Sequence, residues 1–301
     1  MKNYLFLFLS ALGIVALCAC DSKKDNGEKK AEVLLTEARK MIDSEKFDAA
    51  RLLIDSLRNT YPRAFDARRK AIEVMDILEM KEAQHAMVAN DSASTVVKSR
   101  LSVMKNGFLL EKDPRYQTVG FYKDKQQSAS SLHRTCLYAE VDETGQLFLV
   151  SVLTGKQIKH DHITLETTTG ERIESTPCFS FVTDKTNGYE EQATFKKHDD
   201  NGIVDFIAEN AGKTIRVTCK GPNGNHSYDL SKTDVQSIIH CSELESAMRQ
   251  EKQLKHANDS LRMKVKFFLK KKEKERTGSK PAEEKILKEK PTELPKPNKK
   301  L

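Results

Sequence analysis

The sequence contains no tryptophan, and aromatic residues make up only 7% of its 301 residues. Hydrophobic residues reach 38%, while charged residues reach 32%. A chain this poor in large apolar side chains does not fill one large core, so the composition favours helical, elongated or partly solvated parts. The length beyond the first twenty residues is that of one or two domains.

Long apolar runs are absent after the first twenty residues. No later segment approaches 18 consecutive apolar residues, so none predicts a membrane-spanning helix. The sequence also lacks a GxSxG nucleophile elbow, an HExxH zinc motif and a P-loop. From these absences we expect a non-catalytic protein with no cofactor and no bound metal. Aromatic residues are not interleaved with the basic residues beyond Phe268, so a nucleic acid partner is not expected either.

The N-terminus has the pattern of a secretory signal. Lys2 precedes an almost unbroken apolar run over residues 4–17, too short to span a bilayer. The run ends in Leu17-Cys18-Ala19-Cys20, which resembles the lipobox of bacterial lipoproteins. In that family the cysteine thiol receives a diacylglycerol, the signal is cut before it, and the new amine is usually acylated. The resemblance implies a signal peptide over residues 1–19, lipidation of Cys20 and a polar tether over 20–30.

Four cysteines follow the lipobox, and none lies in a CxxC or other tight metal spacing, so zinc is not expected. They are Cys136, Cys178, Cys219 and Cys241. An exported protein sits where disulfides form, and four cysteines allow three pairings. These residues are therefore candidates for at least one disulfide of open pairing. The alternative is that they are small buried hydrophobes.

Residues 31–112 have helical periodicity and predict a helical region that opens with a hairpin. Ala38 and Ala50, twelve residues apart, match the small positions of a tetratricopeptide repeat, and Pro62 matches its closing proline. Only one copy is present, so a plain helical hairpin is the alternative. The segment 64–110 continues with heptad-like spacing, and residues 89–92 predict a break or kink.

Residues 113–230 change to short apolar runs separated by turn residues, which predicts an antiparallel β sandwich or barrel-like domain. The expected strands include 137–141, 147–153, 163–167, 179–183, 192–195, 203–208 and 214–219. Residues 231–269 predict a closing helix, with Ser231 as its N-cap. A seven-residue seam suits packing on the helical region, or a dimer as the alternative. The fold class is therefore α+β.

A family resemblance rests on four strings in this order. They are Phe108-Leu109-Leu110-Glu111-Lys112-Asp113-Pro114-Arg115-Tyr116, Gly120-Phe121-Tyr122, Leu132-His133-Arg134 and Val141-Asp142-Glu143-Thr144-Gly145. The chain resembles a family of lipoproteins from Bacteroides-type bacteria whose members share the order anchor, helical segment, β domain and closing helix. The resemblance covers most of residues 30–250. It implies architecture and location, and carries no catalytic residues.

His160-Asp161-His162 is the sharpest chemical constellation in the β domain. Two histidines at i and i+2 on a strand point to one face and can bind a metal, although exposed polar side chains give the same pattern. His133 lies near Cys136, and His240 adjoins Cys241, which raises thiol catalysis as an interpretation. Asp199-Asp200-Asn201-Gly202 resembles the start of a calcium loop, but a hairpin turn explains all four residues.

Positive charge gathers at the C-terminus, where residues 262–301 hold 15 Lys/Arg against 6 Glu. Its lysines, glutamates and prolines predict a disordered tail over 270–301. Lys270, Lys271 and Lys272 are candidate residues for binding a polyanion, either anionic lipid or acidic glycan. The alternative is a solvated tail without a partner.

Together these features predict a cell-envelope lipoprotein, anchored to the outer membrane by its lipid and facing the periplasm or the cell surface. We expect a non-catalytic binding or scaffold protein with an envelope protein partner. One alternative is a hydrolase or carbohydrate-active domain with its site on the β sheet. Another is a purely structural tether that joins two envelope layers through the tail.

Overall fold

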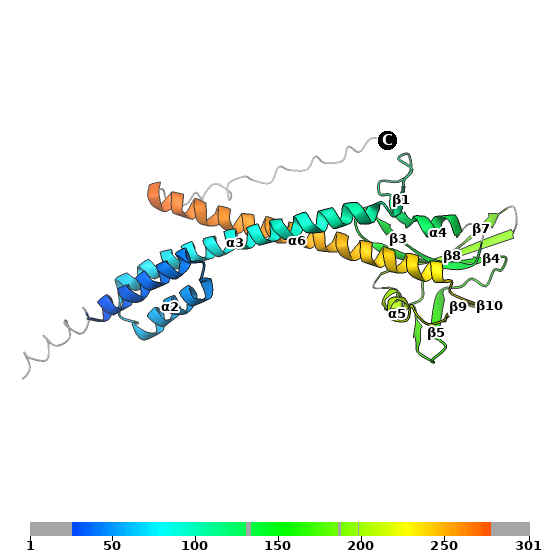
Figure 1. Cartoon of the computed structure of the whole chain (residues 1–301), viewed down its shortest axis with the longest axis horizontal. Helices are drawn as coiled ribbons and strands as arrows, with labels where there is room; N and C mark the ends of the chain where they lie inside the picture. The colour runs from blue at the N-terminus through cyan, green and yellow to red at the C-terminus, as the bar shows by residue number, and fades with distance from the viewer. Residues whose placement is uncertain (1–25, 131–133, 186–187, 198, 278–301) are drawn as a thin grey trace, which may run out of the picture. The chain divides into compact units, whose positions relative to one another are not determined.

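The computed structural model describes residues 26–130, 134–185, 188–197 and 199–277. The chain divides into two compact units, of which unit 1 comprises Met1–Ala89 with Asn258–Leu301 and unit 2 comprises Asn90–Ala257. Helices and two antiparallel sheets confirm the α+β class (Figure 1). Two long helices, α3 (Phe65–Lys105) and α6 (Lys232–Thr277), contribute residues to both units.

Unit 1 is helical and opens with a hairpin, formed by a helix over residues 26–43 and α2 (Phe47–Thr60). The first of these helices begins inside the segment predicted as a tether, so residues 26–30 are helical. Glu45 adopts a positive φ of 58° in the turn between the two helices. Ala38 and Ala50 are fully buried, as close helix packing requires. The tetratricopeptide resemblance itself stays a prediction.

Helix α3 runs without interruption from Phe65 to Lys105, so the helix is not broken at residues 89–92. The segment contains neither proline nor glycine, and these residues cause most sharp kinks. Polar side chains there hydrogen-bond within the helix instead; Thr95 Oγ1 donates to the carbonyl oxygen of Asp91 at 3.0 Å. The boundary between the two units nevertheless falls inside the predicted segment, at Ala89 and Asn90.

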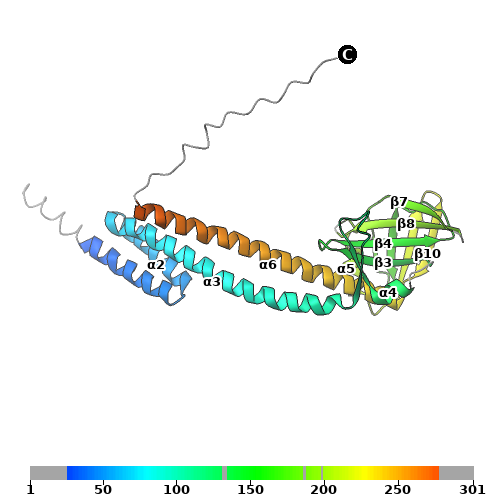
Figure 2. The same ribbon diagram turned by 90° about the horizontal axis from the view of Figure 1, so that it is seen from above.

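The last part of α6 packs along the first part of α3 within unit 1. Lys264 Nζ lies 3.2 Å from Glu79 Oε2, and Lys271 pairs with Asp76. The two helices run in opposite directions, because higher numbers on α6 meet lower numbers on α3 (Figure 2). Helix α6 begins where predicted, since Ser231 Oγ accepts a hydrogen bond from the Asp234 amide at 3.1 Å.

Unit 2 contains two antiparallel sheets that share one apolar core. The first has the order β1 (Phe108–Glu111), β2 (Phe121–Asp124), β3 (Cys136–Asp142), β4 (Leu147–Thr154), β8 (Gly188–Lys196) and β7 (Ser180–Lys185). The second has the order β10 (Gly224–Asp229), β9 (Ile215–Gly221), β5 (His162–Thr167) and β6 (Arg172–Glu174). Ser151 Oγ of β4 lies 3.5 Å from Cys219 Sγ of β9, so the sheets face each other there.

The β3–β4 hairpin has the predicted turn. Asp142 Oδ1 accepts hydrogen bonds from the amides of Thr144 and Gln146 at 2.8 and 2.9 Å. Gly145 adopts a φ of 84°, which an L side chain rarely occupies. A short helix, α4 (Lys125–Ser130), follows β2. The first part of α6 buries Val235, together with Ile238, Cys241 and Leu244, in the same core.

The predicted strand at 203–208 is instead the helix α5 (Ile203–Glu209). Ile203, Val204 and Ile207 are its buried residues, a spacing that fits one helix face. Asp200 Oδ2 accepts a hydrogen bond from the Val204 amide at 3.1 Å. The 199–202 segment therefore starts a helix rather than a hairpin.

The predicted helical segment 64–110 also ends early. The Gly107 amide donates to the Met104 carbonyl at 2.9 Å, and Phe108 then pairs with Asp124 as the first residue pair of β1 and β2.

Candidate functional site

Several predicted site residues lie outside the described part of the chain. Cys20 and the signal peptide precede residue 26, His133 falls in the gap at 131–133, and residues 278–301 follow the last described residue. Within the described residues, no helix is long and apolar enough to cross a membrane. Lipidation of Cys20 therefore stays a prediction from the sequence.

The two histidines of His160-Asp161-His162 have separate environments, contrary to the shared metal face considered above. His160 is fully buried, and its Nδ1 lies 2.5 Å from Glu191 Oε1 on β8. His162 is partly exposed, with Nδ1 2.5 Å from Asp161 Oδ1 and Nε2 3.6 Å from Glu174 Oε1. Among the described residues, no three His, Cys, Asp or Glu side chains are grouped to hold a metal.

Glu191 is a polar centre in the interior of unit 2. Its carboxylate also accepts hydrogen bonds from the backbone amides of Lys159 and His160, the first at 2.9 Å. Lys159 has a φ of 55°, so the loop before β5 bends around this carboxylate. His160 Nε2 has no hydrogen-bond partner among the described residues. Because both side chains are fully buried, a substrate in solvent does not reach them.

Sequence reasoning missed Glu191, although β8 carries a signal for it. Successive residues of a strand point to opposite faces, and Ala193 and Phe195 are buried on the face that Glu191 shares. A carboxylate at one of the alternate strand positions that point into the core, among otherwise apolar residues, indicates a buried ionisable group that needs a partner. The partner, His160, cannot be identified without the sheet pairing.

The second histidine–cysteine neighbourhood does not form a thiol–imidazole pair. His240 Nδ1 lies 2.8 Å from Asp124 Oδ2, and Cys241 Sγ instead donates to the Ala139 carbonyl at 3.2 Å. Burial raises the pKa of the Cys241 thiol, whereas a catalytic cysteine requires a lowered one. The arrangement therefore favours a structural role for Cys241.

All four cysteines of the described chain are free thiols, so the disulfide considered above is not formed in the structure. Each has its own surroundings: Cys136 packs with Val150 and Val152, Cys219 contacts Ser151, and Cys241 contacts β3. Burial raises the pKa of Cys136, Cys178 and Cys219 to about 11. They behave as small apolar residues, which was the alternative.

Lys270, Lys271 and Lys272 belong to α6, so the prediction of a disordered tail from residue 270 is wrong up to Thr277. The side-chain hydrogen bond to Asp76 raises the pKa of Lys271 and fixes this lysine in an ion pair. The apolar seam of α6 continues to Phe268, and α3 lies beside this part of α6. The contact with α3 therefore extends helix α6 into the basic segment.

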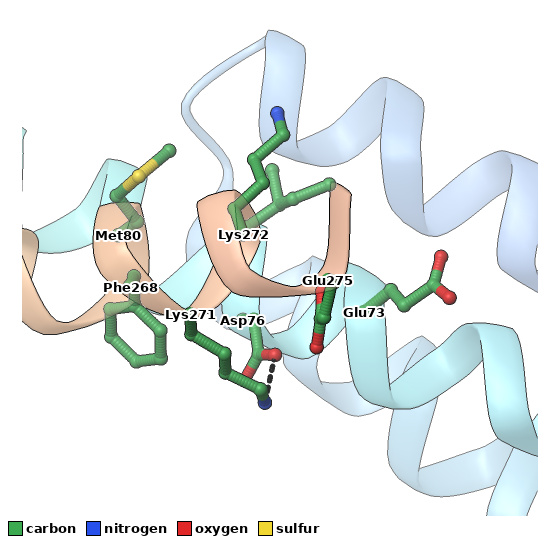
Figure 3. Close-up of a pocket in the computed structure, with 8 residues that line it drawn as sticks. Glu73, Asp76, Met80, Phe268, Lys271, Lys272 and Glu275 are labelled. Atoms are coloured by element: carbon green, nitrogen blue, oxygen red, sulfur yellow. Dashed lines mark hydrogen bonds and ion pairs between the residues drawn. The ribbon is translucent and has the colours of Figure 1, made fainter. Parts of the chain in front are cut away.

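A pocket lies between these two helices in unit 1 (Figure 3). Ile77, Met80 and Phe268 supply its apolar surface, and its volume is about 490 Å³ including the part open to solvent. Its charged lining residues are Glu73, Asp76, Lys271, Lys272 and Glu275. Figure 3 shows Phe268 and Met80 on one side and the Lys271–Asp76 ion pair beneath the end of α6. Such a pocket can hold an apolar side chain flanked by charge.

Comparison with protein-family models, curated proteins and solved structures gives no match for this chain.

The first prediction concerns Glu191. Replacing it with alanine leaves His160 and two backbone amides without their acceptor in the interior, so we expect a loss of about 3–5 kcal/mol in the free energy of unfolding. The matched control is Glu166→Ala on the exposed side of β5, which should change it by less than about 0.5 kcal/mol. Denaturant unfolding followed by circular dichroism measures both. Equal stability of the two variants would contradict a buried carboxylate that the interior depends on.

The second prediction concerns the thiols. Non-reducing mass spectrometry of the denatured mature chain should detect free Cys136, Cys178, Cys219 and Cys241. In the native protein at pH 8, a pKa near 11 leaves on the order of one thiol in a thousand ionised, so alkylation should be slow and should accelerate as the pH rises. A disulfide-linked peptide pair, or fast alkylation of Cys219 at pH 8, would overturn this assignment.

Proposed function

We propose that the chain is a lipid-anchored lipoprotein of the cell envelope that acts as a non-catalytic binding or scaffold protein. The anchor is supported by Lys2, the short apolar run and Leu17-Cys18-Ala19-Cys20. Its family resemblance to Bacteroides-type lipoproteins is part of the same proposal. The outer membrane is the expected location.

The observation that carries the binding role is the pocket between α3 and α6. It is open to solvent, and it combines an apolar surface with charges of both signs. Apolar side chains that remain accessible beside orienting charges are the usual basis of partner recognition. An envelope protein with an exposed apolar side chain next to charged residues is the partner that fits it.

The alternative, a hydrolase or carbohydrate-active site on the sheet, has less support from the geometry. It needs either a cleft with clustered carboxylates or a metal site at His160 and His162. The His160 side chain is 0% exposed and is held by Glu191.

The third prediction tests the anchor. Cys20→Ala removes the thiol that receives the lipid, so the variant should remain unprocessed or should be released from membranes on fractionation. Cys18→Ala is the matched control and should fractionate like the parent. If Cys20→Ala is processed and stays with the membrane fraction as the parent does, Cys20 is not the anchor.

The fourth prediction tests binding at the pocket. In pull-downs from envelope extracts, Met80→Ser with Phe268→Ser should lose partners that the parent retains, because both substitutions remove apolar pocket surface. The control is Val103→Ser with Val96→Ser, which removes comparable exposed apolar side chains elsewhere on α3. Identical partner sets for the pocket variant and the parent would refute a role of the pocket in binding.

A further inference from the structure

A second accessible surface of unit 1 lies where α2 ends and α3 begins. It is a shallow groove lined by Arg58, Phe65, Arg68, Arg69 and Ile72. Phe65 is 63% exposed and Ile72 is 53% exposed. Two large apolar side chains are thus accessible to solvent among three guanidinium groups. We name this surface the basic corner.

The basic corner has a surplus of positive charge. Residues 58–70 contain four arginines and one lysine against a single acid, Asp66. Part of this charge is paired, because Lys70 Nζ lies 2.5 Å from Glu32 Oε1 and Arg58 is 3.9 Å from Asp55 Oδ1.

Arg68 and Arg69 supply positive charge that these ion pairs do not neutralise. Arg68 donates to the Pro62 carbonyl at 2.9 Å, and a neutral carbonyl does not compensate its positive charge. The described residues that line the groove include three arginines and no acid. A ligand in the groove therefore meets positive charge beside apolar surface.

The corner lies at the end of unit 1 that is nearest to the anchor in the sequence. Glu28 Oε1 accepts a hydrogen bond from the Ala67 amide at 2.6 Å, and the Glu32–Lys70 ion pair follows one turn later. These contacts place the start of the helix 26–43 beside the start of α3 (Figure 1). Residue 26 is only six positions after Cys20 in the sequence, and a stretch of that length spans at most about 21 Å.

We propose that the basic corner docks on the anionic phospholipid surface of the membrane that holds the chain. This inference rests on the lipid anchor of the proposed function. Arg58, Arg68 and Arg69 face the lipid phosphates, and Phe65 and Ile72 enter the interface beside them. Basic side chains near an anionic bilayer are attracted within a Debye length of roughly 8–10 Å. Exposed aromatic and aliphatic side chains add burial at the headgroup boundary.

The absence of tryptophan from the chain makes the docking directly measurable. Phe65→Trp introduces a single reporter into the full mature chain, which also carries Cys20→Ser so that no lipid is attached. With vesicles of phosphatidylcholine and phosphatidylglycerol, its emission should shift to the blue and be quenched by brominated lipid. Pure phosphatidylcholine vesicles, or raised salt, should give no shift. The control is Phe179→Trp, whose position in unit 2 is 91% exposed and should report no shift.

Charge variants test the mechanism in the Phe65→Trp background. Arg68→Gln with Arg69→Gln should lower the partition coefficient on anionic vesicles about thirtyfold, since each basic residue near the surface contributes roughly fivefold. Lys98→Gln with Arg100→Gln removes the same charge from the unit 2 part of α3 and should lower it far less. Circular dichroism should give unchanged melting for both pairs, because all four side chains are exposed.

Four results would overturn the proposal. The first is binding to anionic vesicles without a shift in the emission of the Phe65→Trp chain, and the second is an equal emission shift in the Phe179→Trp chain. The third is an equal loss of vesicle binding in both pairs of charge variants. The fourth is an emission shift of the Phe65→Trp chain that an acidic peptide produces at a lower concentration than vesicles do. The last result would identify the corner as a peptide site. Because the assay uses a chain without lipid, its failure is separate from failure of the anchor, which the fractionation of Cys20→Ala tests.

Discussion

Burial of one apolar seam along α3 is the constraint on which the cores of both units depend. Ala67, Ala71, Val74 and Leu78 are fully buried in the core of unit 1. Further along the same helix, Val97 and Leu101 are buried in the core of unit 2. The small residues at the start of the seam let neighbouring helices approach closely. Neither core is complete without this helix.

A narrow seam explains why a chain with 32% charged residues folds. A helix that packs along one stripe leaves most of its surface to solvent, and charged side chains occupy that surface at little cost. Where α6 meets α3 in unit 1, lysines of one helix face acids of the other, as in Lys264–Glu79 and Lys271–Asp76. Exposed pairs of this kind contribute about 0–1 kcal/mol each, so they set register and surface chemistry more than stability.

Ionisable groups have a different role in unit 2. The Glu191 carboxylate is enclosed by His160 and two backbone amides, and it holds the loop that leads into β5. Such a group stabilises the interior only while all its partners are present. The pocket between α3 and α6 and the basic corner, by contrast, lie on unit 1 and are open to solvent.

Local patterns in the sequence predict much of the fold. Short apolar runs between turn residues identify β3, β4, β5, β8 and β9, and the Asp142–Gly145 turn and the Ser231 N-cap are where their residue types indicate. The misses depend on tertiary contacts. Four apolar residues at 203–207 fit a strand or a helix, and the Asp200 cap together with burial against the core selects the helix. The basic segment after Lys270 is helical because α3 lies beside it.

The candidate site was less predictable than the fold, because its residues are distant in sequence. Glu191 and His160 are 31 residues apart, and Asp76 and Lys271 are 195 residues apart. No spacing rule joins such pairs. The disulfide prediction failed for the same reason, since the number of cysteines gives the number of possible pairings but not the distance between the thiols.

We propose that a lipid on Cys20 holds the chain in the envelope. Mass spectrometry of the N-terminal peptide of the purified membrane-bound protein tests it most directly. We predict a peptide that begins at Cys20 and carries the mass of a diacylglyceryl group, with an additional acyl chain on the amine. An unmodified Cys20, or a mature chain that begins at another residue, would contradict lipid anchoring through Cys20.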